Sequence, residues 1–429
     1  MLKNIFTSID IGSNNIKVVV CELHNNKLNL LAASSVSSKG IKRGMIVNAD
    51  EASKSIKEAF EKVESMLGIK IKKVIASIPS YFAEFTYIKG TVNVVNEENL
   101  IGSDEVVDVL GVAMESKLTN DKEMVTIIPV DFKVDDKGGI SNPLGHSGKL
   151  LSARAIMVTT PKKNIYSVVS VLENLGIEVI DIMINGIGNI YSLKTRDMSD
   201  LVGAVIDIGS ETTTVSLYNK TVIVKNSIIG VGSKVLDNDL AFTYKIGKDD
   251  AKKIKETFAL ASKKYASVGD FYEVKNELGE DIKINQFEAT EVVTNRLDEI
   301  LELVKNEILS LSGRELDYIV FTGGMSEMTH FELLINEKFG KKATVGKIRT
   351  IGVRNNIYSA SLGNIIYFVN KLKLKGKNYS MVSTKDSEDL SSVKKNNANL
   401  VSDSMLGKVA QYFFGEWGGQ LCLVWKWIN

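Results

Sequence analysis

The chain has 429 residues, of which 44% are hydrophobic and 24% charged, with 4 prolines. This composition is typical of folded globular proteins and excludes a disordered or fibrous chain, and the length predicts two or more domains. Lys and Arg number 53 against 52 Asp and Glu, so no overall charge favours nucleic acid, and no nucleic-acid partner is expected.

Cysteine and histidine give no sign of a disulfide framework or a metal cluster. Cys21 and Cys422 lie near opposite ends of the sequence, and the three histidines lack the spacing of metal ligands. We therefore expect a reducing compartment. The first residues, MLKNIFTSIDIGS, enter a strand pattern without the apolar core of a signal peptide, which predicts a cytoplasmic protein.

The first element is a strand, turn and strand at residues 8–20, SIDIGSNNIKVVV, and the pattern returns at residues 205–217 as VIDIGSETTTVSL. Gly12 and Gly209 let the backbone approach a ligand, and the N–H and hydroxyl groups that follow can bind an anion. The alternative is that each Asp-Ile-Gly-Ser forms only a hairpin turn. Because the motif is repeated, we interpret the pair as phosphate-binding loops.

Each copy also carries an aspartate at the end of its first strand. Mg²⁺ keeps most of its waters and prefers carboxylates together with substrate phosphates. Asp10 and Asp207 are therefore predicted to hold a hydrated magnesium ion between the two loops.

The first loop is followed by a strand at residues 28–35, a helix at residues 50–68 and a strand at residues 72–80. Apolar residues recur at helical spacing in the helix: Ile56, Ala59, Phe60, Val63, Met66 and Leu67. From about residue 80 to 160, two strand-like segments, a helix near residues 103–118 and a further strand predict a small α+β insertion.

In the second half, the apolar run LDYIVFTGG at residues 316–324 predicts a buried strand that ends in Gly323 and Gly324. This glycine pair would let the backbone lie flat against an adenine or ribose. The continuation GGMSEM is predicted to lead into a helix whose N-terminus favours anions.

Together these motifs resemble the actin, Hsp70 and sugar-kinase superfamily over residues 7–372. The resemblance implies ATP bound with Mg²⁺ between two related halves. It also implies a set of nucleotide-binding residues: Asp10, Gly12, Ser13, Asn14, Asn15, Lys17, Asp207, Gly209, Ser210, Glu211, Thr212, Thr213, Gly230, Gly232, Lys255, Gly323, Gly324, Met325 and Ser326.

The insertion is similar to the extra subdomain of the FtsA family of bacterial cell-division proteins. Residues 127–148, IIPVDFKVDDKGGISNPLGHSG, resemble a family segment whose turn residues occur in the same order. An unrelated α+β insertion is the alternative. The carriers of the resemblance are Pro129, Asp131, Asn142, Pro143, Gly145 and Gly148.

These observations predict an α/β, actin-like fold: two RNase H-like halves around a nucleotide cleft, an inserted α+β subdomain, and a C-terminal amphipathic helix on a flexible linker. The expected boundaries are 1–80 and 161–200 for the first half, 81–160 for the insertion, 201–372 for the second half with a smaller subdomain at about 240–315, 373–403 for the linker, and 404–429 for a membrane-targeting tail.

At two positions, Lys252 and Asn185, the sequence departs from the pattern of that superfamily. Lys255 matches a family lysine near the nucleotide, but Lys252 stands where a glutamate near the sugar is usual, and we interpret Lys252 as part of a solvated helix face. Asn185 stands where a side chain would orient or activate the attacking water, and an amide cannot act as a base. We expect no catalytic residue and slow or negligible ATP hydrolysis.

A helix at about residues 287–311 presents Asn295 and Arg296 at the surface. The resemblance implies that the C-terminal peptide of the tubulin homologue FtsZ docks here, since a guanidinium suits a peptide carboxylate. An ordinary surface arginine is the alternative.

The composition shifts at residues 373–403 to Lys, Ser, Asn and Asp, which is typical of a linker. All 3 tryptophans follow within residues 404–429. An amphipathic helix rich in aromatic residues suits a membrane interface, and its polar residues prevent it from spanning a bilayer. Alternatively, the tail folds back onto the protein or a partner. The predicted membrane-facing residues are Met405, Leu406, Val409, Phe413, Phe414 and Trp417.

The resemblance to FtsA implies a filament-forming protein on the cytoplasmic face of the cell membrane, bound there as a peripheral protein. Such filaments would connect FtsZ and later division proteins to lipid, because many tails in one plane bind with avidity. The alternatives are a sugar or acid kinase with the same nucleotide clamp, an Hsp70-like chaperone, and the related actin-like adaptor of pilus assembly.

Overall fold

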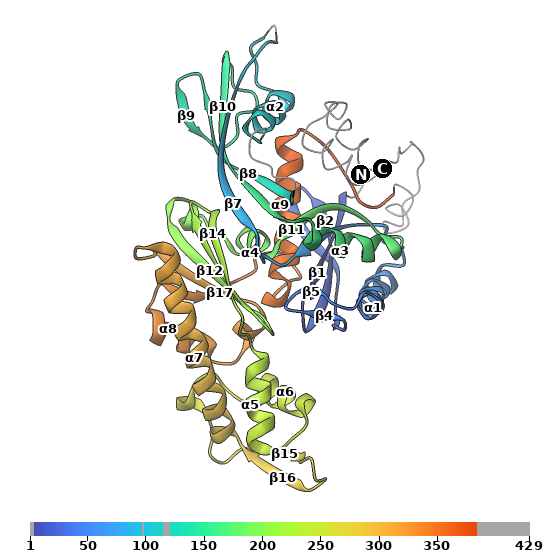
Figure 1. Cartoon of the computed structure of the whole chain (residues 1–429), viewed down its shortest axis with the longest axis vertical. Helices are drawn as coiled ribbons and strands as arrows, with labels where there is room; N and C mark the ends of the chain where they lie inside the picture. The colour runs from blue at the N-terminus through green and yellow to red at the C-terminus, as the bar shows by residue number, and fades with distance from the viewer. Residues whose placement is uncertain (1–3, 97, 115–120, 384–429) are drawn as a thin grey trace.

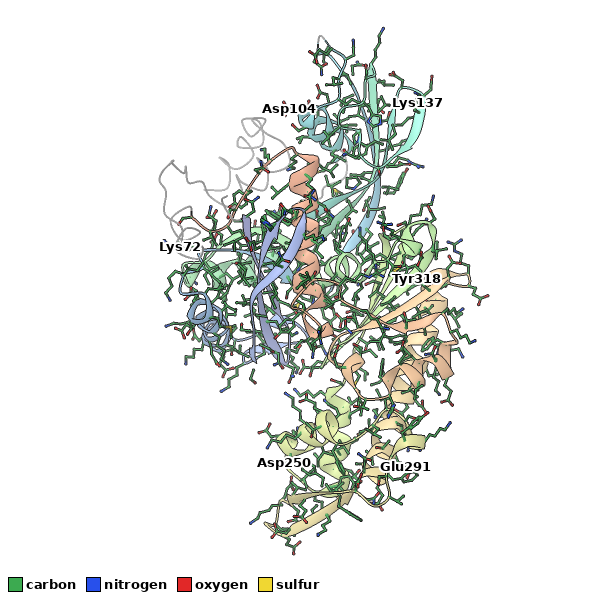
Figure 2. All side chains as sticks on the ribbon, turned by 180° about the vertical axis from the view of Figure 1, so that it is seen from behind. Lys72, Asp104, Lys137, Asp250, Glu291 and Tyr318 are labelled. Carbon is green, nitrogen blue, oxygen red and sulfur yellow. The ribbon has the colours of Figure 1, made fainter. Side chains whose placement is uncertain are left out.

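The computed structural model describes residues 4–96, 98–114 and 121–383. The molecule is elongated, with two sheets near its middle, a small α+β unit at one end and a helical unit with a hairpin at the other (Figure 1). Seen from behind, Asp104 and Lys137 lie on the α+β unit, and Asp250 and Glu291 lie at the opposite end (Figure 2).

The first half is a five-stranded sheet in the order β11-β6-β1-β2-β3. The antiparallel strands β1 (Asn4–Ile11), β2 (Asn15–His24) and β3 (Lys27–Ser37) form a meander, and β6 (Lys73–Ile78) and β11 (Glu178–Ile184) continue the sheet in parallel. A short hairpin of β4 (Ile41–Lys42) and β5 (Met45–Ile46) follows the meander. Helix α1 (Ala49–Leu67) packs against β2 and β3, and α3 (Lys162–Asn174) packs against β11.

Local signals in the sequence define α1. The Asn48 side chain caps the helix by accepting hydrogen bonds from the Asp50 and Glu51 amides, and Gly68 ends it in the left-handed region. Ile56, Ala59, Phe60 and Val63 are buried as predicted, but Met66 is 64% exposed, because it lies on the solvent side of the last turn.

The second half repeats this arrangement. Its sheet has the order β14-β13-β12-β17-β18, with an antiparallel meander of β12 (Val202–Ile208), β13 (Thr213–Asn219) and β14 (Val222–Ile229). The strands β17 (Tyr318–Thr322) and β18 (Ala343–Val345) then pair in parallel, and α8 (Phe331–Phe339) packs against β18. The prediction of two related halves is therefore confirmed.

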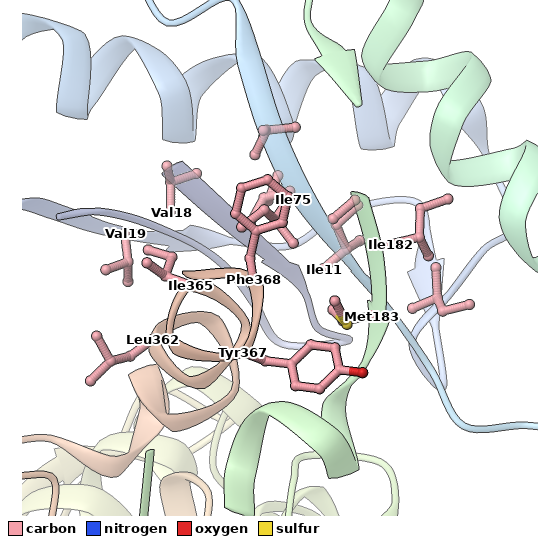
Figure 3. Close-up of a cluster of buried hydrophobic side chains, with 14 of the residues drawn as sticks. Ile11, Val18, Val19, Ile75, Ile182, Met183, Leu362, Ile365, Tyr367 and Phe368 are labelled. Carbon is pink, nitrogen blue, oxygen red and sulfur yellow. The ribbon is translucent and has the colours of Figure 1, made fainter. Parts of the chain in front are cut away.

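Two helices cross between the halves. Helix α4 (Asn185–Leu193) packs against α9 (Ser359–Leu374), and their backbones meet at Gly188 and Gly363. A Cβ on Gly363 would lie 1.6 Å from the Gly188 carbonyl oxygen, so only glycine allows this crossing. Helix α9 then packs on the first sheet, where Leu362, Ile365 and Phe368 enter a core with Val18 and Ile75 (Figure 3).

The predicted α+β insertion is also confirmed. Four antiparallel strands in the order β7-β10-β8-β9 pack against α2 (Ser103–Met114) around a separate core. The strand bounds are β7 (Glu84–Asn93), β8 (Lys122–Val134), β9 (Lys137–Ile140) and β10 (Leu150–Pro161).

The smaller unit of the second half contains α5 (Lys234–Tyr244), α6 (Lys248–Thr257), the hairpin of β15 (Phe271–Lys275) and β16 (Asp281–Asn285), and part of α7 (Gln286–Ser312). Helix α7 also contacts β13 and β14, so it joins this unit to the second sheet. The short 3-10 helices are Asp197–Asp200, Lys263–Tyr265, Gly324–Glu327 and Asn356–Tyr358.

The predicted start of the flexible linker at residue 373 is wrong. Helix α9 continues to Leu374, and the following segment packs on the first half. The Met381 amide donates to the Ile5 carbonyl at 2.9 Å, and Lys73 Nζ donates to Tyr379 Oη at 3.2 Å. The remainder of the predicted linker and the predicted membrane-facing residues lie outside the described part of the chain. Within that part, none of the helices has the length and apolarity to cross a bilayer.

Candidate functional site

A cavity of about 440 Å³ lies between the two halves and contains both Asp-Ile-Gly-Ser loops. The glycine pair after β17 and helices α5 and α6 also contribute to its wall. Most of the residues predicted to bind a ligand line it: Asp10, Gly12, Ser13, Asn14, Asn15, Lys17, Asp207, Gly209, Ser210, Glu211, Thr212, Lys255, Gly323, Gly324 and Met325.

The two loops have the same local geometry. The Gly12 amide donates to the Asn15 carbonyl at 3.2 Å, and the Gly209 amide donates to the Thr212 carbonyl at 3.0 Å. A Cβ on Gly12 would lie 2.8 Å from the Asn15 carbonyl oxygen, so the turn has no room for a larger residue at this position. The sequence repeat therefore corresponds to a structural repeat, with one copy on each side of the cavity.

Asp10 ends β1 and is held by two neighbours. Lys17 Nζ lies 2.9 Å from Asp10 Oδ2, and Asn185 Nδ2 donates to Asp10 Oδ1 at 3.3 Å. Burial alone would lower the pKa of Lys17, but the Asp10 carboxylate, with a smaller contribution from Asp207, raises it above its ordinary value. Lys17 is therefore a fixed positive charge at the first loop.

Asp207 occupies the matching position at the end of β12. Asn189 Nδ2 donates to its Oδ2 at 2.9 Å. Burial raises the pKa of Asp207, and the negative charge of Asp10 adds to the effect. A hydrated cation near both carboxylates would reduce this cost, so the pair fits a magnesium ion bound through water.

Gly323 is essential to the geometry at Asp207. Its backbone has φ 86° and ψ 176°, a conformation restricted almost entirely to glycine. A Cβ there would lie 2.4 Å from Asp207 Oδ1, whereas a Cβ on Gly324 would meet only Ile357 Cγ2 at 3.7 Å. As predicted, GGMSEM leads toward a helix, α8 (Phe331–Phe339), but the turn directly after the pair is a four-residue 3-10 helix, Gly324–Glu327, so the N-terminus of α8 does not lie at the glycines.

A contact that the sequence did not indicate joins the two loops. Arg43 and Gly44 form the turn between β4 and β5, and both have positive φ, 51° and 75°. The Arg43 amide donates to Glu211 Oε2 at 2.7 Å, and the Gly44 amide donates to Ser13 Oγ at 2.7 Å. This turn, which we call the cross-cleft turn, links the first loop to the second.

Glu211 also forms an ion pair with Lys234, whose Nζ lies 2.9 Å from Oε1. Burial alone would raise the pKa of Glu211, but the Arg43 amide and the Lys234 ammonium lower it below its ordinary value. The ionised Glu211 carboxylate therefore holds the cross-cleft turn in place.

Two lysines of α6 point to the cavity. Lys255 is buried, and its Nζ lies 2.7 Å from Asp237 Oδ1 on α5. The prediction of a solvated face for Lys252 is wrong. Lys252 is half-buried in the cavity wall, and its Nζ donates to Asn14 Oδ1 of the first loop at 3.4 Å, because α6 folds across toward the first half.

Four predicted residues do not line the cavity. Thr213 Oγ1 donates to the Val231 carbonyl, and Ser326 Oγ donates to the Gly323 carbonyl, both at 2.8 Å. A Cβ on Gly232 would lie 2.6 Å from the Gly209 carbonyl oxygen, so Gly232 permits close packing behind the second loop. Gly230 lies beside the Arg43 guanidinium.

Four buried polar atoms in the cavity wall have no hydrogen-bond partner among the described residues, although Asp237 Oδ1 is in an ion pair with Lys255: Tyr81 Oη, Asn185 Oδ1, Asp237 Oδ1 and Asn356 Oδ1. Buried polar groups are nearly always paired in native proteins. Their concentration in one cavity, together with two glycine loops and fixed positive charge, fits a large polar ligand that carries phosphate groups.

The predicted peptide-docking residues lie outside this cavity, on α7. Asn295 Oδ1 accepts from Lys263 Nζ at 3.0 Å. Arg296 is half-buried rather than fully exposed. Its Nε donates to Asp239 Oδ2 at 2.6 Å, and it also forms an ion pair with Glu299.

The comparisons with known proteins identify the family. The model described as "Cell division protein FtsA" matches residues 204–363, and the model described as "SHS2 domain inserted in FTSA" matches residues 83–159. The chain belongs to the FtsA family. The SHS2 match coincides with the four-stranded insertion of β7 to β10.

Whole-length relatives agree with this assignment. FtsA of Bacillus subtilis (strain 168) is 27% identical over 376 residues, covering 87% of this chain and 85% of the relative. FtsA of Streptococcus pneumoniae serotype 2 is 29% identical over 360 residues, covering 82% and 78%. A role in cell division is therefore confirmed at the level of the family.

Solved structures show the same fold at low identity. A chain of the PilM-PilN type IV pilus biogenesis complex matches with TM-score 0.59 and 14% identity, covering 85% of this chain and 98% of that one. MreB5 of Spiroplasma citri bound to ADP matches with TM-score 0.50 and 13% identity, covering 87% and 99%. The predicted actin-like fold is confirmed.

Proposed function

We propose that this chain is an ATP-binding, actin-like division protein that polymerises at the cytoplasmic membrane and anchors an FtsZ ring to it. One observation carries the nucleotide part of the proposal: the two repeated glycine loops, one from each half, line the same cavity together with Asp10 and Asp207. Membership in the FtsA family supports the division role.

The cavity offers separate regions for each part of the nucleotide. The amides and hydroxyls of residues 12–15 and 209–212 would bind the phosphates, with Lys17 as a positive charge beside them. Asp10 and Asp207 would hold a hydrated magnesium ion, which would neutralise phosphate charge. Three apolar side chains of the wall would receive the base: Met325, Met328 and Ile357.

Hydrolysis is expected to be slow. Asn185 begins α4 at the junction of the halves, and its amide nitrogen donates to Asp10. An amide can position a water molecule by hydrogen bonding, but it cannot accept the proton that an attacking water loses. The bound nucleotide would therefore persist and stabilise the filament rather than turn over rapidly.

The docking of an FtsZ C-terminal peptide is proposed at Asn295 and Arg296. Because Asp239 and Glu299 already neutralise Arg296, a peptide carboxylate would have to displace one of them. Fluorescence anisotropy with a labelled FtsZ peptide tests the site. Arg296→Ala should weaken binding about tenfold, as loss of one charged hydrogen bond would. Arg314→Ala, at an exposed position beyond α7, should leave binding unchanged.

The tail at residues 404–429 would attach filaments to lipid. Each amphipathic helix binds weakly and reversibly, so attachment depends on many tails presented together. Nucleotide-dependent assembly and membrane binding are then coupled.

Vesicle pelleting tests the tether. The full chain with ATP and Mg²⁺ should sediment with anionic phospholipid vesicles, and a chain lacking residues 404–429 should remain in solution. Electron microscopy of the pelleted sample should show filaments on the lipid. Equal sedimentation of the two chains would refute the tether, and vesicles without filaments would refute the assembly step.

A further inference from the structure

Two segments of the chain carry basic residues and no acidic ones. Neither residues 23–49 nor residues 338–383 contain Asp or Glu, although the whole chain has 52 acidic residues against 53 basic ones. Such segments form a basic surface only where the fold brings them together. The structure does so at one end of the first sheet, where β1 and β6 begin and β2 ends.

The two segments meet along one row of residues across this end of the sheet. Strands β1, β2 and β3 lie side by side, with Ile5 paired to Glu22 and Glu22 paired to Asn29. A parallel bridge joins Asn29 to Ile351, in the loop between β18 and the 3-10 turn that precedes α9. On the other side of the row, the Ile5 carbonyl accepts from the Met381 amide. The loop before α9 and the segment after α9 therefore flank the same row.

Exposed cations lie on both sides of this row. Because the bridge at Ile351 is parallel, Arg349, two residues before it, lies toward the same end of the sheet as Lys27, two residues before its partner. Lys72, on the first half in Figure 2, directly precedes β6. We call the set the basic end. Its exposed cations are Lys27, Lys72, Lys347, Arg349, Lys373 and Lys377.

The cations of the basic end are not neutralised within the chain. None of the six has an ion pair among the residues that the structure describes. The nearby acids Glu64 and Glu178 are each paired with a different lysine, at 2.5 and 3.7 Å. Two further acids, half-buried Glu22 and exposed Glu173, leave the six cations in excess. Like charges gathered on one face repel each other, and an anionic partner removes this cost.

The shape and position of the basic end favour a lipid surface as that partner. None of the six cations lines the nucleotide cavity. They flank a row of five chain segments about 4.8 Å apart, which spans roughly 20 Å and suits many headgroups rather than one bound ion. The described chain ends at Ser383, two residues after Met381, and the proposed membrane tail follows at residues 404–429. The basic end thus lies where the chain leaves the body toward its tail.

We propose that the basic end binds the headgroups of anionic phospholipids and fixes the orientation of the body on the membrane, in addition to attachment by the tail. The inference rests on the proposed membrane tether. Each Lys or Arg close to an anionic leaflet strengthens binding about fivefold, and salt screens this attraction. The alternative partner is an acidic protein segment, which would leave lipid binding independent of these residues.

Sedimentation of the full chain with vesicles tests the proposal, with ATP, Mg²⁺ and an equimolar mixture of phosphatidylcholine and phosphatidylglycerol. The triple variant Lys27→Gln, Lys347→Gln and Arg349→Gln should bind at least about tenfold more weakly than wild type, because three charges leave the interface. The difference should shrink at about 1 M salt, where the Debye length falls to ~3 Å.

A matched control removes the same charge elsewhere. Lys248→Gln, Lys275→Gln and Lys305→Gln change exposed lysines of α6, β15 and α7, and this triple variant should bind vesicles as wild type does. A loss as large in the control as in the first variant would show that only net charge matters and would overturn the inference.

Lysine acetylation of the wild-type chain, read by mass spectrometry, provides a test without any variant. Vesicles should slow the acetylation of Lys27, Lys72 and Lys347, whereas Lys248 and Lys275 should react at their rates in solution. Unchanged rates at the first three lysines would overturn the inference, and this result holds even if a triple variant fails to fold.

The outcomes separate this inference from the tether on which it rests. Equal vesicle affinity of the Lys27, Lys347 and Arg349 triple variant and wild type would assign the basic end to an acidic protein partner and leave the tether intact. A wild-type chain that sediments with no vesicle would refute the tether itself.

Discussion

Replacement of Gly323 by alanine should damage the fold and the candidate site together. An L-residue at φ 86° and ψ 176° costs about 1–3 kcal/mol in backbone strain. The new Cβ would also lie 2.4 Å from Asp207 Oδ1 and 2.7 Å from the Ile208 carbonyl oxygen, so the strand end must shift. We expect a loss of about 3 kcal/mol or more in the free energy of unfolding, since forced overpacking adds ~1–3 kcal/mol.

The neighbouring glycine is the matched control. Gly324→Ala places its Cβ in ordinary contact with Ile357, and the loss should stay below about 1 kcal/mol. Urea denaturation followed by circular dichroism measures both variants, and nucleotide titration should also show weaker binding for Gly323→Ala. Similar stability of the two variants would refute the role assigned to Gly323.

Three further predictions concern other contacts. Because the pKa of Glu211 is lowered in the folded chain, its carboxylate stabilises the fold above pH 4.5. This contribution is lost as the pH falls through the folded-state pKa, which lies below 4.5. Glu211→Gln should therefore lose about 1 kcal/mol at pH 7 and show a smaller decline than wild type in acid denaturation; parallel declines would contradict this. Burial, with the charge of Lys371, lowers the pKa of Lys375 to about 6 from 10.5, so the wild-type chain loses stability as the pH falls from 10.5 toward 6. Lys375→Met should stabilise the chain more at pH 7 than at pH 10, with a difference of about 1 kcal/mol or more in the free energy of unfolding. An equal effect at the two pH values would refute the lowered pKa of Lys375. Gly363→Ala should prevent the α4–α9 crossing and lower the melting temperature by several degrees, whereas Gly138→Ala, with open space around its Cβ and no positive φ, should change it less.

Sequence patterns predicted the features that depend on local or repeated signals. The two Asp-Ile-Gly-Ser copies predicted two related halves and paired loops, because a repeat is visible without knowledge of the fold. Alternating and helical periodicity predicted α1 and the α+β insertion. These are properties of residues close together in the chain.

Contacts between distant segments could not be predicted in this way. Arg43 at positive φ carries no turn signal of the kind that Asn-Gly gives, and its partner Glu211 is 168 residues away. In the sequence, Lys252 has the pattern of a solvated helix face, but in the structure its side chain contacts the first loop. Asp237 looked like any acidic residue in a first helical turn, and only its burial beside Lys255 distinguishes it.

The linker boundary was misjudged for a similar reason. Composition averages over many residues, whereas Tyr379 and Met381 are single side chains in a polar segment. Each side chain makes a specific contact with the first half: Lys73 Nζ donates to Tyr379 Oη, and the Thr7 amide donates to Met381 Sδ. Two such contacts hold the segment in place without changing its average composition.

The central claim is that the loops at Asp10 and Asp207 bind one magnesium nucleotide from opposite sides. A crystal structure of the full chain grown with Mg²⁺ and a non-hydrolysable ATP analogue tests it most directly. We expect triphosphate density in contact with the amides of residues 12–15 and 209–212, and a hydrated metal ion between the two carboxylates. A nucleotide bound elsewhere, or a cavity without one at saturating concentration, would contradict it.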